Sequence, residues 1–257
     1  MSLVDLFAGA RRDGAVLHFE SPDSWMQGRT LYGGLTAALA LEAARGADAD
    51  LPPLRSAQIA FIGPLSGPVS VEAKLLRRGR NAAFVTADVR AGDTLGVRAM
   101  FVLMSNLQSA IDHTDVAPPP TTIALDAAEP ARPRGAGKFF TDNFEFRHAR
   151  GQDSEPEFLR WARLRERDGV DPAVEVLAAA DALPPAAMPL FGAPAPISTM
   201  TWQINMLTAA PQSDDGWWLL RARADYTRNG CSSQFMHIWN ARGEPIAQAI
   251  QSVAIFA

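Results

Sequence analysis

Hydrophobic and polar residues alternate over two long stretches of the chain, and the two stretches have the same layout. The first covers 68–104 and the second covers 216–257. In each, three alternating runs are separated by short turns that contain glycine. Alternation of this kind is typical of strands that bury one face, and Asn and Gly favour the turns between antiparallel strands. Each stretch therefore predicts an antiparallel meander.

The two meanders also align with each other without gaps. Their turn glycines coincide, Gly79 with Gly230 and Gly92 with Gly243. Identity elsewhere is low, so the shared pattern is the main evidence. A unit that recurs after more than half of the chain predicts two copies of one fold.

A buried helix is predicted in the first half. The run 35–46 is rich in alanine and apolar nearly all round, and Gly46 is a suitable stop. Gly33 and Gly34 come directly before it. Two glycines there could let a ligand or another backbone approach the free N–H groups of the helix start, or could simply allow tight packing of helix on sheet. Both interpretations stay open at this point.

The remaining elements complete two similar units. Strands are predicted at 16–19 and 55–62 in the first half, and at 158–163 and 199–207 in the second. A second helix is predicted over 172–180, with its proline near the start. Each half thus combines a helix with an antiparallel sheet, and the helix is expected to cover the apolar face of that sheet.

Composition divides the chain between the two units. Proline gathers with Ala, Thr and acidic residues after residue 110, which predicts an extended and mobile linker. We therefore expect an N-terminal repeat over 1–110, a linker over 111–137 and a C-terminal repeat over 138–257.

Composition and charge also exclude several classes of protein. Hydrophobic residues make up 47% of the 257 residues, enough for a proper core, and the net charge of −4 without a long basic run argues against a nucleic-acid partner. The single cysteine, Cys231, excludes an internal disulfide and fits a reducing cytoplasm. No run of about 18 apolar residues is present, so no membrane span is expected. The four histidines show no metal spacing, and neither a metal nor a cofactor is expected.

In this order and spacing, the elements resemble the hotdog fold, and two copies in one chain resemble the double-hotdog acyl-CoA thioesterases of the thioesterase II type. The resemblance covers about 28–103 and 140–256. It is carried by Leu-Tyr-Gly-Gly at 31–34, by Ala-Ala-Asp at 179–181 and by the last strand around 246–251. It implies an α+β protein with two antiparallel sheets, each wrapped around a helix and joined as an internal pseudo-dimer.

The resemblance also implies a catalytic site in the second repeat. The family's Asp and Gln map onto Asp181 and Gln251, and its hydroxyl residue maps best onto Thr199, or onto Ser198 or Thr201 if the strand register slips. In such a site the carboxylate accepts a proton from water, and the amide and hydroxyl hold that water. The first repeat lacks the acid and the amide, so one active site per chain is expected.

Each of these residues also has a structural interpretation. Asp181 could cap a further helical piece over 181–188, and Thr199 could be an ordinary strand threonine. Gln251 shares a strand face with apolar residues, where an amide without partners would cost about 1–3 kcal/mol. The catalytic interpretation is favoured because the three residues occur together in the repeat.

The substrate is expected to lie between the second helix region and its sheet. Gly33 and Gly34 would offer backbone amides to the carbonyl. The acyl chain would lie near Leu183, Met188 and Phe191, whose flexible apolar side chains suit a variable ligand. The CoA end would leave toward solvent.

The predicted function is hydrolysis of a fatty or related acyl-CoA to free acid and CoA by an activated water. The alternatives are a non-catalytic acyl- or CoA-binding hotdog protein and a hotdog enoyl-CoA hydratase or dehydratase. A hydratase calls for a paired Asp and His, which the loop at 32–34 does not offer, and the chain has no Gly-Xaa-Ser-Xaa-Gly elbow of a serine hydrolase. At 201–203 the chain has Thr-Trp-Gln, where the family strand often carries Asp-His-Ser.

Self-association is also expected. Four tryptophans are placed by the pattern on strands whose outer faces need cover, and a large apolar patch implies a partner surface. The family resemblance points to a homo-oligomer as well. The four are Trp202, Trp217, Trp218 and Trp239.

Overall fold

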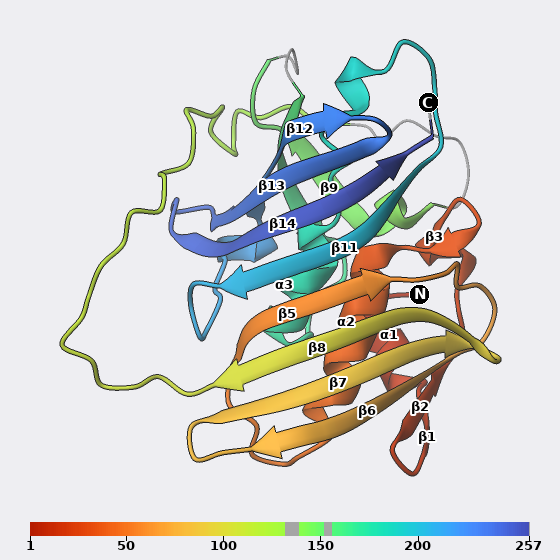
Figure 1. The fold of residues 1–257 in the computed structure, drawn as a ribbon. Helices are drawn as coiled ribbons and strands as arrows, with labels where there is room; N and C mark the ends of the chain where they lie inside the picture. Colours follow the sequence, from red (N-terminus) through yellow and green to blue (C-terminus); the bar gives the residue numbers. More distant parts are fainter. Residues whose placement is uncertain (132–138, 152–155, 257) are drawn as a thin grey trace.

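In the computed structural model, an antiparallel sheet curves around two helices (Figure 1). The structure describes residues 1–131, 139–151 and 156–256. Within these residues, hydrogen bonds join twelve strands into one sheet, and two very short strands pair separately.

Six strands of the large sheet come from the first half of the chain and six from the second. The first six are β1 (Arg11–Asp13), β2 (Val16–Phe19), β5 (Leu54–Phe61), β6 (Val69–Arg78), β7 (Ala82–Ala91) and β8 (Thr94–Met104). The second six are β9 (Phe144–His148), β10 (Glu157–Leu164), β11 (Ile197–Met206), β12 (Trp218–Arg228), β13 (Cys231–Asn240) and β14 (Pro245–Ile255). The separate pair is β3 (Met26–Gln27) and β4 (Thr30–Leu31). Both predicted meanders are confirmed, with β6, β7 and β8 in the first and β12, β13 and β14 in the second.

The strands follow one another in the order β1-β2-β6-β7-β8-β5-β11-β14-β13-β12-β10-β9. The two halves meet at β5 and β11, which pair antiparallel so that Gln203 lies opposite Gln58. The order outward from this seam is the same on both sides: the inner strand, then the meander, then short edge strands. The sheet is therefore continuous across the two halves, instead of forming two separate sheets.

Two helices lie side by side against the concave face of the sheet (Figure 1). They are α2 (Gly33–Arg45) and α3 (Pro172–Ala180), and a short α1 (Leu3–Ala8) precedes β1. Both longer helices were predicted at these positions from their alanine content and their flanking residues. In the described residues, no helix is long and apolar enough to cross a membrane.

Close contact between the two helices explains one of the glycines before α2. A Cβ on Gly34 would lie 2.6 Å from the carbonyl oxygen of Ala178 in α3 and 2.5 Å from the Tyr32 hydroxyl oxygen. The Tyr32 hydroxyl donates a hydrogen bond to that same carbonyl, with 2.7 Å between the oxygens. Glycine at position 34 therefore allows tight packing of α2 against α3.

Part of the predicted linker packs against the second half of the sheet. The Trp161 indole donates to the carbonyl of Ile123, Arg147 donates to the carbonyl of Leu125, and the segment continues to a short bridge at Pro130. The expectation of an extended, mobile linker is wrong for this part, because its backbone carbonyls and apolar side chains find partners on the sheet. The rest of the linker, 132–137, lies outside the described residues.

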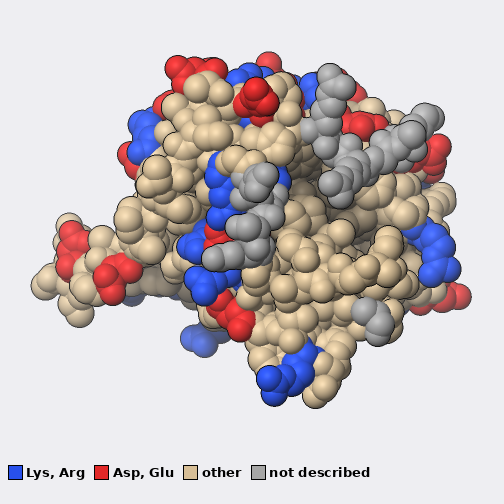
Figure 2. Space-filling view, turned by 90° about the horizontal axis from the view of Figure 1, so that it is seen from above, with Lys and Arg blue, Asp and Glu red and all other residues tan. Residues whose placement is uncertain are grey.

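The predicted surface patch of tryptophans is absent from the structure, because all four side chains are buried. Trp217 and Trp239 are buried beneath the linker in a small cluster with Leu159, and Trp202 and Trp218 are buried in the main core. An oligomer interface built on these four side chains is therefore excluded. On the face shown in Figure 2, basic and acidic residues are intermixed around a largely uncharged centre.

Candidate functional site

Asp181 follows the last residue of α3 and is the C-cap of that helix. The prediction that it begins a further helix over 181–188 is wrong, because Pro184 and Pro185 interrupt helical hydrogen bonding. Only a short 3₁₀ turn follows, at Met188–Leu190. The Asp181 carboxylate is therefore not used as a helix N-cap.

Gln251 on β14 donates a hydrogen bond from Nε2 to Oδ1 of Asp181, at 2.7 Å. Its own Oε1 accepts a hydrogen bond from Nε2 of Gln234 on β13, at 2.6 Å. The Oε1 of Gln234 in turn accepts the backbone N–H of Ala186, at 2.8 Å. Both glutamines are almost fully buried, with exposed fractions of 1% and 2%. The partners that a buried Gln251 requires are thus Asp181 and Gln234.

Gln234 is not among the catalytic residues predicted from the sequence. It lies directly opposite Gln251 in the β13–β14 hairpin, and paired residues of an antiparallel hairpin point to the same face. The signal was present in the sequence, since both glutamines take positions of the hairpin that are otherwise mostly apolar. It could be read only once the register of the hairpin was known.

The start of α2 closes the other side of Asp181. A Cβ on Gly33 would lie 2.5 Å from Oδ2 of Asp181 and 3.1 Å from the Phe61 ring. The backbone of Gly34 also forms a hydrogen bond with the carboxylate. Free N–H groups and the helix dipole make a helix start favourable for a negative charge.

The pKa of Asp181 is set by two opposing effects. Burial raises it, and the hydrogen bonds from Gln251 and the Gly34 backbone lower it, which leaves a pKa of about 7. A carboxyl group with such a pKa holds its proton in part at neutral pH and is well matched to general-base chemistry. The neighbouring Tyr32 hydroxyl has a pKa raised well above its usual value, mainly by burial and further by Asp181, so it stays protonated.

Thr199 reaches the same face of the sheet through a β-bulge. The pairing between β11 and β14 shifts between Thr199 and Thr201, so that Thr199 lies opposite the buried Val253. Simple alternation along β11 would have put Thr199 on the outer face, together with Thr201. A bulge adds one residue, here Met200, and reverses the alternation. In the described residues, no hydrogen bond joins the Thr199 hydroxyl to Asp181 or to Gln251.

The register also decides between the other hydroxyl residues. Thr201 lies opposite Ser252 on the outer face, and Ser198 is exposed. Of the three, Thr199 is therefore the hydroxyl residue that shares a face with Gln251. The structure directly joins two of the three predicted catalytic residues and places the third on the same side of the sheet.

Two family models match the sequence. Residues 114–255 match the acyl-CoA thioesterase C-terminal domain, and residues 21–104 match the acyl-CoA thioesterase N-terminal domain. The C-terminal match alone covers more than half of the chain. The chain belongs to the acyl-CoA thioesterase family. The predicted family and activity class, a thioester hydrolase for acyl-CoA, are thereby confirmed.

Solved structures similar to this thioesterase confirm the hotdog fold. A conserved protein with a hot dog fold from Alicyclobacillus acidocaldarius is 21% identical, with a TM-score of 0.86 over 100% of this chain and 99% of that one. A protein from Thermobifida fusca YX described as a thioesterase II is 20% identical, with a TM-score of 0.85 over 100% and 98%. A tesB protein from Mycobacterium avium subs. paratuberculosis is 19% identical, with a TM-score of 0.80 over 100% of both chains. Among curated proteins, none matches the sequence significantly.

The predicted acyl-binding residues of the thioesterase follow Asp181 along the chain. Leu183 is buried, and Phe191 packs in part against the core, whereas Met188 is 40% exposed. The segment that carries them also supplies the Ala186 N–H that Gln234 accepts. The residues after α3 therefore connect the catalytic candidates to the molecular surface.

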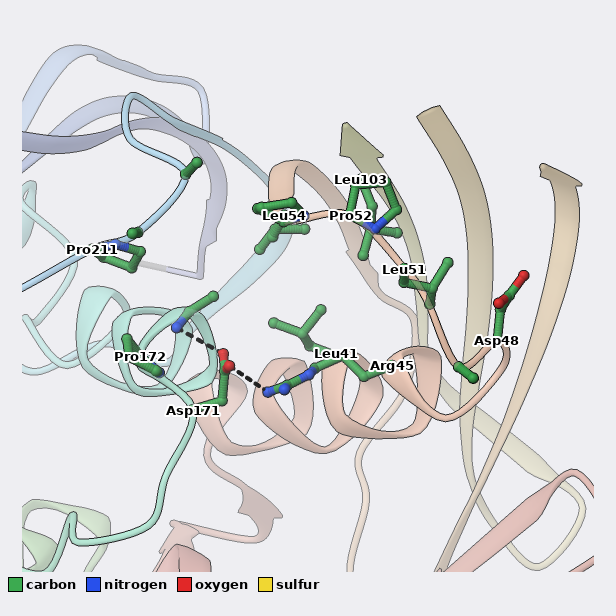
Figure 3. A pocket seen from close by; sticks show the side chains of 15 residues that line it. Leu41, Arg45, Asp48, Leu51, Pro52, Leu54, Leu103, Asp171, Pro172 and Pro211 are labelled. Atoms are coloured by element: carbon green, nitrogen blue, oxygen red, sulfur yellow. Dashed lines mark hydrogen bonds and ion pairs between the residues drawn. The ribbon is translucent and has the colours of Figure 1, made fainter. Parts of the chain in front are cut away.

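A large cavity of the thioesterase lies at the opposite end of the helix pair (Figure 3). It has a volume of about 400 Å³ and lies between the C-terminal end of α2 and the N-terminal end of α3. Arg45 of α2 and Asp171 of α3 form an ion pair there, with 2.7 Å between Nη1 and Oδ2. Asp171 also caps α3 by accepting the backbone N–H of Ala173. The candidate catalytic residues do not line this cavity.

No metal site accompanies the carboxylate among the residues that the structure describes. Within them, no group of three or more His, Cys, Asp or Glu side chains is arranged to hold a metal ion.

Substitution of Gly33 by Ala is expected to reduce thioesterase activity strongly, by about 10-fold or more. The added Cβ would meet Oδ2 of Asp181 at 2.5 Å and would push the carboxylate out of position, and small displacements of a catalytic group carry costs of this order. Initial rates with one acyl-CoA at saturating concentration would measure the effect. Gly192 has no atom within 4 Å of its Cβ position, so Gly192→Ala is a matched control that should keep full activity. Equal activity of both variants would contradict the close approach.

Proposed function

We propose that Asp181 is the general base of this thioesterase and that it activates water for attack on the thioester carbonyl of acyl-CoA. The observation that carries the proposal is the partly buried hydrogen bond from Gln251 to Asp181, beside the start of α2, with a pKa of about 7 for the carboxyl group. A base with this pKa is sufficiently ionised at neutral pH and can still retain a proton.

In the proposed reaction, the water oxygen bonds to the carbonyl carbon and Asp181 takes the water proton. The tetrahedral intermediate then breaks its C–S bond, and the thiolate of CoA takes the proton from Asp181. The products are the free acid and CoA. One Nε2 hydrogen of Gln251 is engaged by Asp181, and the other can hold the water together with the Thr199 hydroxyl.

The developing oxyanion needs donors close to Asp181. The first turn of α2 supports this role, because Gly33 approaches the carboxylate without a side chain and its N–H belongs to a helix start. Hydrogen-bond donors that are already oriented toward the oxyanion stabilise a tetrahedral intermediate. We therefore assign the N–H of Gly33 to the carbonyl end of the substrate, and Gly34, whose backbone bonds to Asp181, holds the carboxylate beside it.

We further propose that the chain is an internal pseudo-dimer of two hotdog units. The support is the strand order, which is the same outward from both sides of the β5–β11 seam. The units would be 1–110 and 138–257, with 111–137 between them. Because 123–131 packs on the second half, this part of the linker would act as a cover for the C-terminal unit.

The pseudo-dimer would have one active site. The end of the helix pair that holds Asp181 has an equivalent end with Arg45 and Asp171 (Figure 3). There the carboxylate caps α3 and pairs with a guanidinium, so it is not available as a base. This difference supports a single catalytic carboxylate per chain.

The acyl chain would extend from Asp181 along the segment that carries Leu183, Met188 and Phe191. Leu183 is buried next to the site, and Met188 is exposed further along. This arrangement supports an apolar path from the carboxylate to the surface, with the CoA end in solvent.

A panel of acyl-CoA substrates of increasing chain length tests the proposed function. We expect release of the CoA thiol with a preference for certain chain lengths, because an apolar path of limited size discriminates between chains by about 1–3 kcal/mol for each methylene. Thiol release is followed with a thiol reagent, and enoyl-CoA is included to detect hydration. Binding without thiol release would support the non-catalytic alternative, and loss of the enoyl double bond would support a hydratase.

A further inference from the structure

The direction of the hydrogen bonds behind Asp181 is set by one backbone group. The N–H of Ala186 can only donate, so the side chain of Gln234 must present its oxygen to it. The amide nitrogen of Gln234 then faces Gln251 and donates to Oε1 at 2.6 Å. The amide nitrogen of Gln251 consequently faces Asp181 and donates to Oδ1.

The reverse orientation of Gln251 would be unfavourable for the reaction. Rotation of its amide by a half turn would place Oε1 against the Asp181 carboxylate, and two acceptors would face each other without a proton between them. That arrangement favours the protonated carboxyl group, which cannot act as a base. Gln251 itself has no other described partner that would prevent the rotation.

We propose that Gln234 is a positioning residue of the thioesterase, which orients the amide of Gln251 so that its N–H groups face Asp181 and the catalytic water. Gln234 reaches Asp181 only through Gln251, and its orientation is set by the Ala186 N–H. The inference rests on the proposed role of Asp181 as the base.

Among the described residues, few titratable groups affect Asp181, so the role of Gln234 can be measured from the pH dependence of the reaction. Tyr32, at the start of α2, has a pKa raised mainly by burial and further by the charge of Asp181, and Gln251 and Gly34 supply neutral hydrogen bonds to Asp181 from β14 and α2. Tyr32 stays protonated near neutral pH. The acid limb of the pH–rate profile should therefore report the ionisation of Asp181.

The main test is Gln234→Met, which keeps the approximate size of the side chain and removes both hydrogen bonds. We expect kcat at pH 7 to fall by about 5-fold, and the midpoint of the acid limb to move upward by about one pH unit, because Gln251 no longer favours the ionised carboxylate. The measurement is kcat as a function of pH with one acyl-CoA substrate. An unchanged midpoint in a folded Gln234→Met protein would overturn the proposal.

The matched control is Ser232→Ala on the same strand. Ser232 is also buried and lies two residues away on the same face. Its hydroxyl forms a hydrogen bond with the Thr227 hydroxyl, at 3.0 Å, and takes no part in the series of hydrogen bonds that leads to Asp181. The Ser232→Ala variant should lose some stability, and the acid limb of its pH–rate profile should keep the wild-type midpoint. An equal shift in Ser232→Ala would mean that any buried defect on β13 moves the profile, and it would overturn a specific role of Gln234.

A second variant, Gln234→Glu, decides the case if Gln234→Met does not fold. The carboxylate can accept the Ala186 N–H but cannot donate to Gln251, so Gln251 should turn its N–H groups away from Asp181. The acid limb should then move upward at least as far as expected for Gln234→Met. An acid limb that stays in place would overturn the proposal.

A double-mutant cycle separates positioning from general stability. In a Gln251→Met background, Gln234→Met should produce no further shift of the acid limb, since its effect passes through Gln251. Asp181→Asn is measured alongside. If Asp181→Asn is fully active, the proposed function fails; if it is inactive while Gln234→Met shows no shift, only the present inference fails.

Discussion

Asp181→Asn is expected to lower kcat by about 10²-fold or more while the protein stays folded. The substitution keeps the shape of the side chain and can still accept the Gln251 hydrogen bond, but it removes the group that takes the water proton. The rate of CoA release with a substrate identified in the acyl-CoA panel measures the loss, and circular dichroism checks the fold.

The matched control for this prediction is Asp171→Asn. Asp171 is the other carboxylate at the end of a helix in the α2–α3 pair, and asparagine is an equally good N-cap. Its kcat should stay close to that of the wild type. Gln251→Ala should also lose turnover, and Thr199→Ala should lose less, because a hydroxyl is one of several donors to the water. Full activity of Asp181→Asn would show that the base lies elsewhere.

The same substitution is expected to stabilise the protein at high pH. The pKa of Asp181 is about 7 in the folded protein, against an ordinary value of 3.8. The folded state therefore keeps a proton that the unfolded state releases between these two values. Stability from this group is fully present below the lower value and is lost as the pH rises through the upper one.

Between pH 5 and pH 8 the wild type should thus lose about 3 kcal/mol of unfolding free energy relative to Asp181→Asn. Urea titrations of both proteins at the two pH values measure the difference, with Asp171→Asn as the control that should follow the wild type. Parallel pH dependences of wild type and Asp181→Asn would mean that the carboxyl group titrates normally. An active-site carboxylate that destabilises the fold when it ionises is typical of a group retained for function.

Local patterns were sufficient for the two meanders and the two longer helices of this fold. The strands of both meanders depend on alternation over a few residues, and the two main helices depend on alanine content and on flanking glycine or proline. The recurrence of the meander indicated two copies of one unit, and the resemblance to a known family, carried by the order and spacing of the elements, indicated the hotdog architecture. These patterns lie within short windows of sequence, so they can be interpreted without knowledge of the tertiary contacts.

The site was predicted in part. Asp181 and Gln251 came from the family resemblance, and the structure brings them within hydrogen-bond distance. Gln234 was missed because its role depends on the register between β13 and β14. The role of Gly33 was left open because only the position of the Asp181 carboxylate shows why a side chain would not fit.

The sequence by itself determined the strands of the two meanders and the two longer helices, since hydrophobic periodicity and turn residues act locally. The tertiary structure alone decided which way the decisive side chains face. The bulge at Met200 moves Thr199 to the inner face, the end of α3 turns Asp181 toward α2, and the linker buries Trp217 and Trp239. Each of these outcomes depends on pairing or packing between segments far apart in the chain, and a local pattern contains no information on such contacts.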